Sequence, residues 1–186
     1  TRELDANLET CRRMAEDAAE RGVDWLLYPE NAPFLGSDGE KSRVAEPIDG
    51  TIVDHYRALA REGGFWVTLG SFPERSDEPE RTYNTQVLIA PDGSISAVYR
   101  KIHLFDVDVE GGRSFRESAH VKGGSEVVTS RIKAVDSEDS DGRSVEVGLS
   151  ICYDLRFPEL YRALARRGVD AVTAPSAFTL QTGRDH

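Results

Sequence analysis

The chain has 186 residues, of which 39% are hydrophobic and 30% charged, the size and composition of one ordinary globular domain. Its formal net charge is −10, so its electrostatic field repels nucleic acids and anionic membranes, and we expect neither as a partner. No stretch approaches the ~20 apolar residues of a membrane-spanning helix, and no basic segment followed by an apolar one suggests a secretory signal.

The first half of the chain alternates helices and strands. Apolar residues recur every three or four positions over residues 3–21 and predict an amphipathic helix that ends at Gly22. The apolar run within residues 23–31 predicts a buried strand that leads into a loop. Thr51 is expected to cap a second helix, which the glycine pair at 63–64 ends. Residues 65–72 then read as a further strand.

A hairpin and a long loop are expected next. Residues 85–101 contain two strand-like runs around the Pro91-Asp92-Gly93 turn, the pattern of a β-hairpin. Residues 104–118 show no regular pattern and predict an irregular loop, and long loops in compact domains are often functional.

The last third predicts two strands, a helix and another strand. Strands near 127–135 and 145–151 flank an acidic turn, residues 157–167 are helical, and residues 169–178 return to a strand. The alternation predicts an α/β protein with a mixed sheet. The apolar runs need cover on both faces of that sheet, so a second layer, for example another sheet, is expected.

Composition also suggests the environment of the protein. Its basic residues are nearly all arginine, with lysine only at positions 41, 101, 122 and 133. An acidic, lysine-poor surface suits a halophilic, high-salt cytoplasm, although a GC-rich genome also favours arginine. Cys11 lies on an expected helix stripe and Cys152 at an expected strand end, so nothing favours a disulfide between them. We therefore expect a reducing, cytoplasmic location.

Three chemically useful side chains follow strand-like runs. Glu30 follows residues 25–29, Lys101 ends the hairpin, and Cys152 follows residues 145–151. Because ligands bind beyond the carboxyl ends of strands in open α/β sheets, these residues are candidates for one site. Each also has an ordinary interpretation, as a solvated glutamate, a surface lysine and a buried core sulfur.

Cys152 is the candidate nucleophile of this set. A polar turn containing Tyr153 and Arg156 follows it and leads into the expected helix. A helix N-terminus lowers a thiol pKa and offers N–H groups to an anion, as an acyl-transfer nucleophile requires. His103 is a rival base for Cys152, in a dyad like that of papain, and can equally be a structural histidine. Spacing alone leaves these alternatives open.

Six stretches together resemble the nitrilase (carbon–nitrogen hydrolase) superfamily, specifically its Nit branch, which includes omega-amidases. They are LLYPEN at 26–31, YNT at 83–85, YRKIHLFDVDVEG at 99–111, FRES at 115–118, GLSICYDLRFPELYRALARRG at 148–168 and PSAF at 175–178. The resemblance implies one domain over residues 1–186 with a four-layer αββα sandwich. It also implies a catalytic triad of Glu30, Lys101 and Cys152, with Glu117 as a second glutamate of the site.

The resemblance further implies a reaction. The Cys152 thiolate attacks a small linear amide, Lys101 and the backbone N–H of Tyr153 hold the oxyanion, and a thioester is hydrolysed to release the acid after ammonia has left. No metal or cofactor is implied. Relatives of the branch act on carboxylate-bearing amides, for which Arg156 is the candidate cation, and Phe34, Tyr153 and Phe178 are candidate apolar walls.

Compared with this family, the first strand and the C-terminal part are expected to be missing, and a full-length chain is expected to form a homo-oligomer, a dimer or larger. Two alternatives to hydrolysis stay open on the same scaffold. One is acyl transfer to an acceptor other than water, and the other is an inactive binding or scaffold protein.

Overall fold

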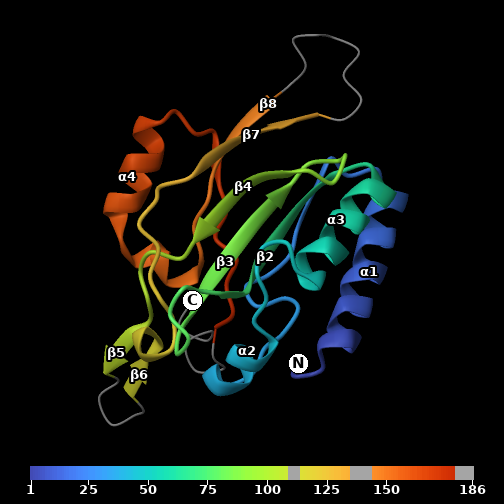
Figure 1. Ribbon diagram of the computed structural model, residues 1–186. Helices are drawn as coiled ribbons and strands as arrows, with labels where there is room; N and C mark the ends of the chain where they lie inside the picture. Colours follow the sequence, from blue (N-terminus) through green and yellow to red (C-terminus); the bar gives the residue numbers. More distant parts are fainter. Residues whose placement is uncertain (109–113, 135–143, 179–186) are drawn as a thin grey trace.

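Figure 1 shows the computed structural model, which describes residues 1–108, 114–134 and 144–178. Its helices are α1 (Leu4–Glu20), α2 (Asp38–Val44), α3 (Thr51–Gly63) and α4 (Pro158–Arg166), with 3₁₀ helices at Glu117–Ala119 and Cys152–Arg156. Its strands are β1 (Trp25–Leu27), β2 (Trp66–Arg75), β3 (Thr82–Ile89), β4 (Ile95–Arg100), β5 (Asp106–Asp108), β6 (Ser114–Arg116), β7 (Thr129–Lys133), β8 (Ser144–Gly148) and β9 (Ala171–Val172). None of the helices in these described ranges is long and apolar enough to cross a membrane.

The strands form two main sheets and a small ribbon. The first sheet has the order β1-β2-β3-β4, with β1 and β2 parallel and the other pairs antiparallel. The second has the order β7-β8-β9, and β5 pairs with β6 in the ribbon. In Figure 1, α1 and α3 lie on one side of the first sheet and α4 lies beyond the second. The αββα sandwich expected from the resemblance is therefore confirmed.

The first core fills the space between α1, α3 and the first sheet. On α3, the apolar side chains of Ile52, Tyr56 and Leu59 are buried against the sheet. Tyr28, directly after β1, packs edge-to-face on Tyr56 at 5.1 Å between ring centroids. Burial of these large apolar side chains holds the helices on the sheet and fixes the backbone that leads from β1 into the next loop.

The second core lies between the two sheets. Leu88 and Tyr99 of the first sheet pack with Val147 of β8 and with Leu149 and Ile151, which follow it. Neighbouring residues in a strand point to opposite faces, so Gly148 turns toward α4 instead. A Cβ on Gly148 would lie 2.8 Å from the Leu164 side chain, so the glycine permits the close packing of α4 on the second sheet.

Most predicted elements are confirmed, but the region before α3 differs. The structure contains α2, a helix that the apolar pattern did not predict because none of its residues is buried. Thr51 is the first residue of α3 and not its cap. Instead the Glu46 carboxylate accepts hydrogen bonds from the Thr51 hydroxyl and the Ile52 N–H, both at 2.8 Å. A carboxylate from outside the helix thus satisfies one of the first N–H groups.

Three further expectations need correction, and a fourth concerns residues that the structure does not describe. β1 is not fully buried, since it is an edge strand and Leu27 is exposed. The region expected as an irregular loop contains the β5–β6 ribbon, and the expected strand at 169–178 is regular only over β9. The predicted acidic turn at 136–142 lies outside the described residues.

Candidate active site

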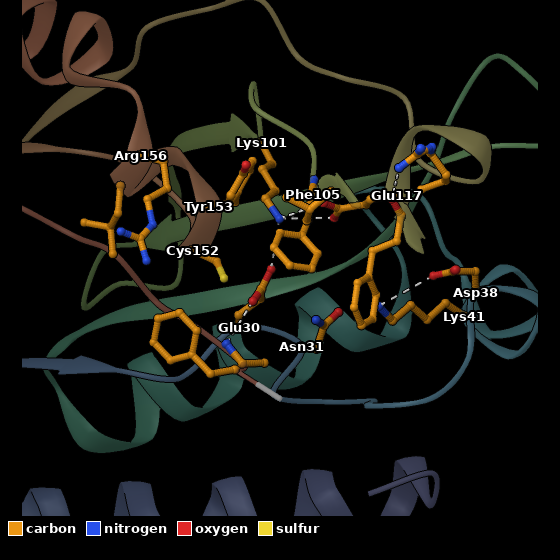
Figure 2. A pocket seen from close by; sticks show the side chains of 16 residues that line it. Glu30, Asn31, Asp38, Lys41, Lys101, Phe105, Glu117, Cys152, Tyr153 and Arg156 are labelled. Atoms are coloured by element: carbon orange, nitrogen blue, oxygen red, sulfur yellow. Dashed lines mark hydrogen bonds and ion pairs between the residues drawn. The ribbon is translucent and has the colours of Figure 1, made fainter. Parts of the chain in front are cut away.

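The three predicted strand-end residues line one cavity. Glu30, Lys101 and Cys152 all face a space of about 690 Å³, together with Glu117 (Figure 2). Glu30 comes from the loop after β1, Lys101 follows β4, and Cys152 comes from the second sheet after β8. The site is therefore assembled where the ends of the two sheets meet.

The Glu30 carboxylate is held from several sides. The Asn84 side-chain amide donates to Glu30 Oε1 at 2.9 Å, and the Ala177 backbone N–H donates to Oε2 at 2.9 Å. The Lys101 Nζ lies 3.5 Å from Oε1. The next residue, Asn31, has a φ of +55° and donates its N–H to the Ser71 hydroxyl at 2.9 Å. This sharp turn keeps the carboxylate directed into the cavity.

Lys101 is buried between two carboxylates. Its side chain is 2% exposed, and its Nζ donates to Glu117 at 2.8 Å and 3.2 Å in addition to its contact with Glu30. Burial alone would lower the pKa of Lys101, but the charges of Glu117 and Glu30 outweigh it, and the pKa lies above its usual value. The ammonium is thus charged and fixed, which suits it to bind an anion formed beside it.

Glu117 is positioned by the chain that precedes it. Its carboxylate accepts the Phe105 N–H at 2.6 Å and also lies 3.4 Å from the Asn84 amide. Asn84 therefore contacts both glutamates of the site. Sequence reasoning gave Asn84 no role, although asparagine is depleted from strands and its place within β3 was a usable signal.

Cys152 is the first residue of the 3₁₀ helix that follows β8, and its backbone is strained. Its φ is +48°, a left-handed conformation that costs energy in a residue other than glycine, and its N–H donates to the Pro175 carbonyl at 2.9 Å. A nucleophile on a strained turn after a strand presents its side chain to the cavity. The expected helix begins only at Pro158, so Cys152 does not lie at the N-terminus of α4.

The Cys152 thiol is protonated at rest, contrary to the expectation of a lowered pKa. Burial and the negative charge of Glu30 raise the pKa of Cys152 to about 11, while Lys101 acts in the opposite direction. The thiol and the Glu30 carboxylate line the same cavity, close enough for the carboxylate charge to act on the thiol. Glu30 is therefore placed to accept the proton at the moment of attack, as a general base does.

Asp154 anchors the turn that carries the nucleophile. Its carboxylate is fully buried and accepts the Tyr99 hydroxyl at 2.7 Å, the Ile151 N–H at 2.9 Å and the His103 N–H at 3.0 Å. These partners come from β4, from the segment after it, and from the residue before Cys152. One carboxylate thus ties the nucleophile turn to the strand that delivers Lys101, a role that local sequence patterns do not reveal.

His103 is a partner of Asp154, which argues against the alternative dyad. Its Nδ1 lies 2.8 Å from Asp154 Oδ1, and its ring stacks on Phe157 with centroids 3.8 Å apart. Among the described residues that line the cavity, His103 is not present, whereas Glu30 and Cys152 are. The contacts of His103 are those of a structural histidine.

The predicted substrate-binding residues divide into two groups. Tyr153, Arg156 and Phe178 line the cavity as expected. Phe34 is 5% exposed and is absent from the described cavity wall, so the structure does not bring it to the site. Sequence reasoning missed several lining residues, namely Asn31, Asp38, Lys41, Phe105, Val107, Phe115, Arg116, Leu155 and Ala177.

No group of three or more His, Cys, Asp or Glu side chains in the described ranges is arranged to hold a metal ion. The chemistry available in the cavity is that of a thiol, two carboxylates, an ammonium and nearby backbone N–H groups. A thiol with an adjacent base and a fixed cation is the arrangement needed for acyl transfer through a covalent intermediate.

Comparison with known proteins agrees with this geometry. A sequence model described as carbon-nitrogen hydrolase matches residues 1–186. The deaminated glutathione amidase of Synechocystis sp. is 40% identical over 184 residues, which cover 98% of this chain and 65% of that protein. The chain thus spans less than two thirds of that relative's length.

Two solved structures are also similar. The NitFhit protein of C. elegans has a TM-score of 0.82 and 33% identity, over 100% of this chain and 43% of that one. An amidase from Nesterenkonia sp. AN1, in a glutamate-to-glutamine mutant with acrylamide added to its active-site cysteine, has a TM-score of 0.75 and 25% identity, over 98% of this chain and 65% of that one.

Proposed function

The chain belongs to the carbon–nitrogen hydrolase family, and on that premise we propose that it hydrolyses a small, carboxylate-bearing linear amide through a thioester on Cys152. The observation that carries the proposal is the position of the Glu30 carboxylate. It lies 3.5 Å from the Lys101 ammonium and shares with the Cys152 thiol a cavity large enough for a small molecule, where its charge raises the pKa of that thiol. We propose residues 1–186 as a single domain of this family.

The first half of the reaction forms the thioester. Glu30 accepts the thiol proton while the Cys152 sulfur attacks the amide carbon, and the carbonyl oxygen becomes an oxyanion. The Lys101 ammonium and the Tyr153 N–H stabilise that oxyanion. The Cys152 N–H is already used by the Pro175 carbonyl, which leaves the neighbouring amide for this role. Protonated Glu30 then gives its proton to the departing nitrogen, and the C–N bond breaks.

The second half hydrolyses the thioester. Glu30 accepts a proton from water while the water oxygen attacks the thioester carbon, and the same cation and N–H stabilise the second oxyanion. The carbon–sulfur bond breaks, the sulfur recovers its proton from Glu30, and the acid leaves. Glu117 acts on Lys101, because its two contacts keep the ammonium charged and directed at the cavity.

The proposed substrate is an amide that carries a carboxylate. The Synechocystis relative is named for deaminated glutathione, and a peptide-like amide of that kind releases an amine, whereas a primary amide releases ammonia. The cavity combines apolar walls from Phe105, Val107 and Phe115 with the cationic Arg156. Such a lining suits a short chain with an anionic group.

Product analysis on single-residue variants tests the proposed function. Acid and amine release from a panel of primary amides and deaminated glutathione is measured by mass spectrometry. Cys152→Ala and Glu30→Gln are expected to lose turnover, while Cys11→Ala, which removes the other cysteine, keeps it. Acid quenching of the wild type is expected to trap an acyl adduct on Cys152. Unchanged turnover in Glu30→Gln would contradict the proposal.

Two further parts of the proposal have separate tests. Product formation with an added amine distinguishes hydrolysis from acyl transfer, and we propose that water is the acceptor. We also propose a homo-oligomer, measured by light scattering after size-exclusion chromatography. A cytoplasmic location is proposed because Cys11 and Cys152 are both free, as in a reducing compartment.

A further inference from the structure

The cavity is richer in positive charge than the rest of the chain. Its lining contains four basic residues, Lys41, Lys101, Arg116 and Arg156, against three acidic ones, Glu30, Asp38 and Glu117. The whole chain, in contrast, has a net charge of −10 and only four lysines, two of which line this cavity. Basic residues concentrated in one concave site of an acidic protein favour an anionic ligand there.

Lys41 is one of these cations and is only weakly paired. Its side chain is 19% exposed, and its ion-pair partner among the described residues is Asp38, at 4.0 Å, the outer limit of such a pair. Lys41 lies on α2, whose start is fixed by hydrogen bonds from the Ser37 N–H and hydroxyl to the Glu40 carboxylate. The side chain is therefore largely buried and anchored on a helix, and its ammonium is weakly paired.

The other cations are engaged elsewhere or lie at the reacting end. Lys101 is held between two glutamates, and Arg116 is half exposed and bound by both oxygens of Asp108 at 2.7 Å and 2.8 Å. Arg156 comes from the same 3₁₀ helix as Cys152. Figure 2 shows Arg156 on the Cys152 side of the cavity and Lys41 on the opposite side, beyond Asn31.

We infer that Lys41 is a specificity-determining residue that binds a carboxylate at the end of the substrate remote from the scissile amide. This inference rests on the proposed function and adds the recognition site to it. A carboxylate that reaches Lys41 replaces the long Asp38 contact with a short, charge-assisted hydrogen bond in a partly desolvated place. Apolar Val107 and Phe115 line the wall of the same cavity and can contact the methylene chain between the two ends.

Matched substrates test the inference in kinetics. The series consists of monoamides of straight-chain dicarboxylic acids, each paired with a neutral amide in which a methyl group replaces the carboxylate. The preference is the ratio of kcat/KM for the acid-bearing amide to kcat/KM for its neutral partner. In Lys41→Met this ratio is expected to fall about 10- to 100-fold, mostly because KM for the acid-bearing amide rises. Lys41→Arg keeps part of the preference. Lys133→Met, which makes the same charge change at an exposed site outside the cavity, keeps all of it.

Asp38→Asn is expected to change the preference for the acid-bearing amide in the direction opposite to Lys41→Met. Removing the carboxylate that competes for Lys41 is expected to increase the preference for the acid about twofold to fivefold. If Lys41→Met keeps the full preference across the series, or if Lys133→Met lowers it equally, the inference is wrong.

A binding measurement separates this inference from the proposed function. In Cys152→Ala protein, calorimetric binding of the same monoamides is expected to weaken about 10- to 100-fold when Lys41→Met is added. Lys41-dependent binding without turnover in the wild type would contradict the proposed hydrolysis and support the carboxylate site. If Lys41→Met leaves the affinity for the monoamides unchanged, or if no monoamide binds, the inference of a carboxylate site is wrong.

Discussion

Replacing Glu30 by glutamine is expected to change two reactions of Cys152 in opposite directions. Glu30→Gln preserves side-chain size but removes the base and its negative charge. Amide hydrolysis should fall by about 10²- to 10⁴-fold, the usual contribution of a general base. The same charge is one of the causes that raise the pKa of Cys152 to about 11, so its loss should make the resting thiol easier to ionise and more reactive toward an alkylating agent.

The size of the second effect follows from the thiol pKa. With a pKa of about 11, roughly one thiol in 10³ is ionised at pH 8. Burial is the largest cause of the raised pKa and remains in the variant. If the pKa falls by about one unit, the thiolate fraction rises about tenfold, and the lower intrinsic nucleophilicity of a more acidic thiol reduces the gain in rate to about threefold to tenfold.

Acrylamide alkylation followed by intact mass measures this rate directly. All variants carry Cys11→Ala, so that only Cys152 reacts. Glu117→Gln is the matched control, because it removes an equal charge from the same cavity but contacts Lys101 and not the thiol, and its gain should be smaller. In the wild type the rate should continue to increase toward pH 11 instead of levelling near pH 9. Equal or slower alkylation of Glu30→Gln at pH 8 would refute the reasoning.

Three further substitutions test the supporting contacts. Lys101→Met removes the cation between the buried Glu30 carboxylate and the partly buried Glu117 carboxylate, and the free energy of unfolding measured in urea should fall by about 3–5 kcal/mol. Asp154→Asn leaves fewer acceptors for several buried donors. It should lower the free energy of unfolding by about 2–4 kcal/mol in the same assay, and it should also lower turnover. His103→Asn should lower turnover by less than about 10²-fold, because removing a general base lowers turnover by more than that. A larger loss of turnover at unchanged stability would instead support His103 as the base of Cys152.

The triad was predictable because each member follows an apolar run. A polar residue at the end of a buried strand marks the edge of a sheet where sites form, and this pattern identified Glu30, Lys101 and Cys152 in the sequence. The pattern could not show that the residues meet, since Cys152 lies in a different sheet from the strands that carry the other two. The apolar runs predicted only that some second layer covers the sheet. The resemblance to a known family identified that layer as a second sheet.

Other features were not predictable from local pattern, for identifiable reasons. Helix α2 buries none of its residues, so it has no apolar stripe, and its signal was the pair of Ser37 and Glu40. The direction of the Cys152 pKa depends on Glu30, a carboxylate that only the folded chain places beside the thiol. Phe34 was predicted as a cavity wall because aromatic residues often form one, but its side chain is buried away from the described cavity wall.

The packing between the two sheets sets the distances on which the proposed catalysis depends. Glu30 is carried by the first sheet, yet the Ala177 N–H that holds its Oε2 follows β9 of the second sheet, as Cys152 follows β8. The Tyr99 hydroxyl, from β4, reaches across to Asp154 at the base of the nucleophile turn. A shift of one sheet relative to the other would therefore move the thiol away from both the base and the cation. The intersheet core does more than stabilise the fold, because it also aligns the reacting groups.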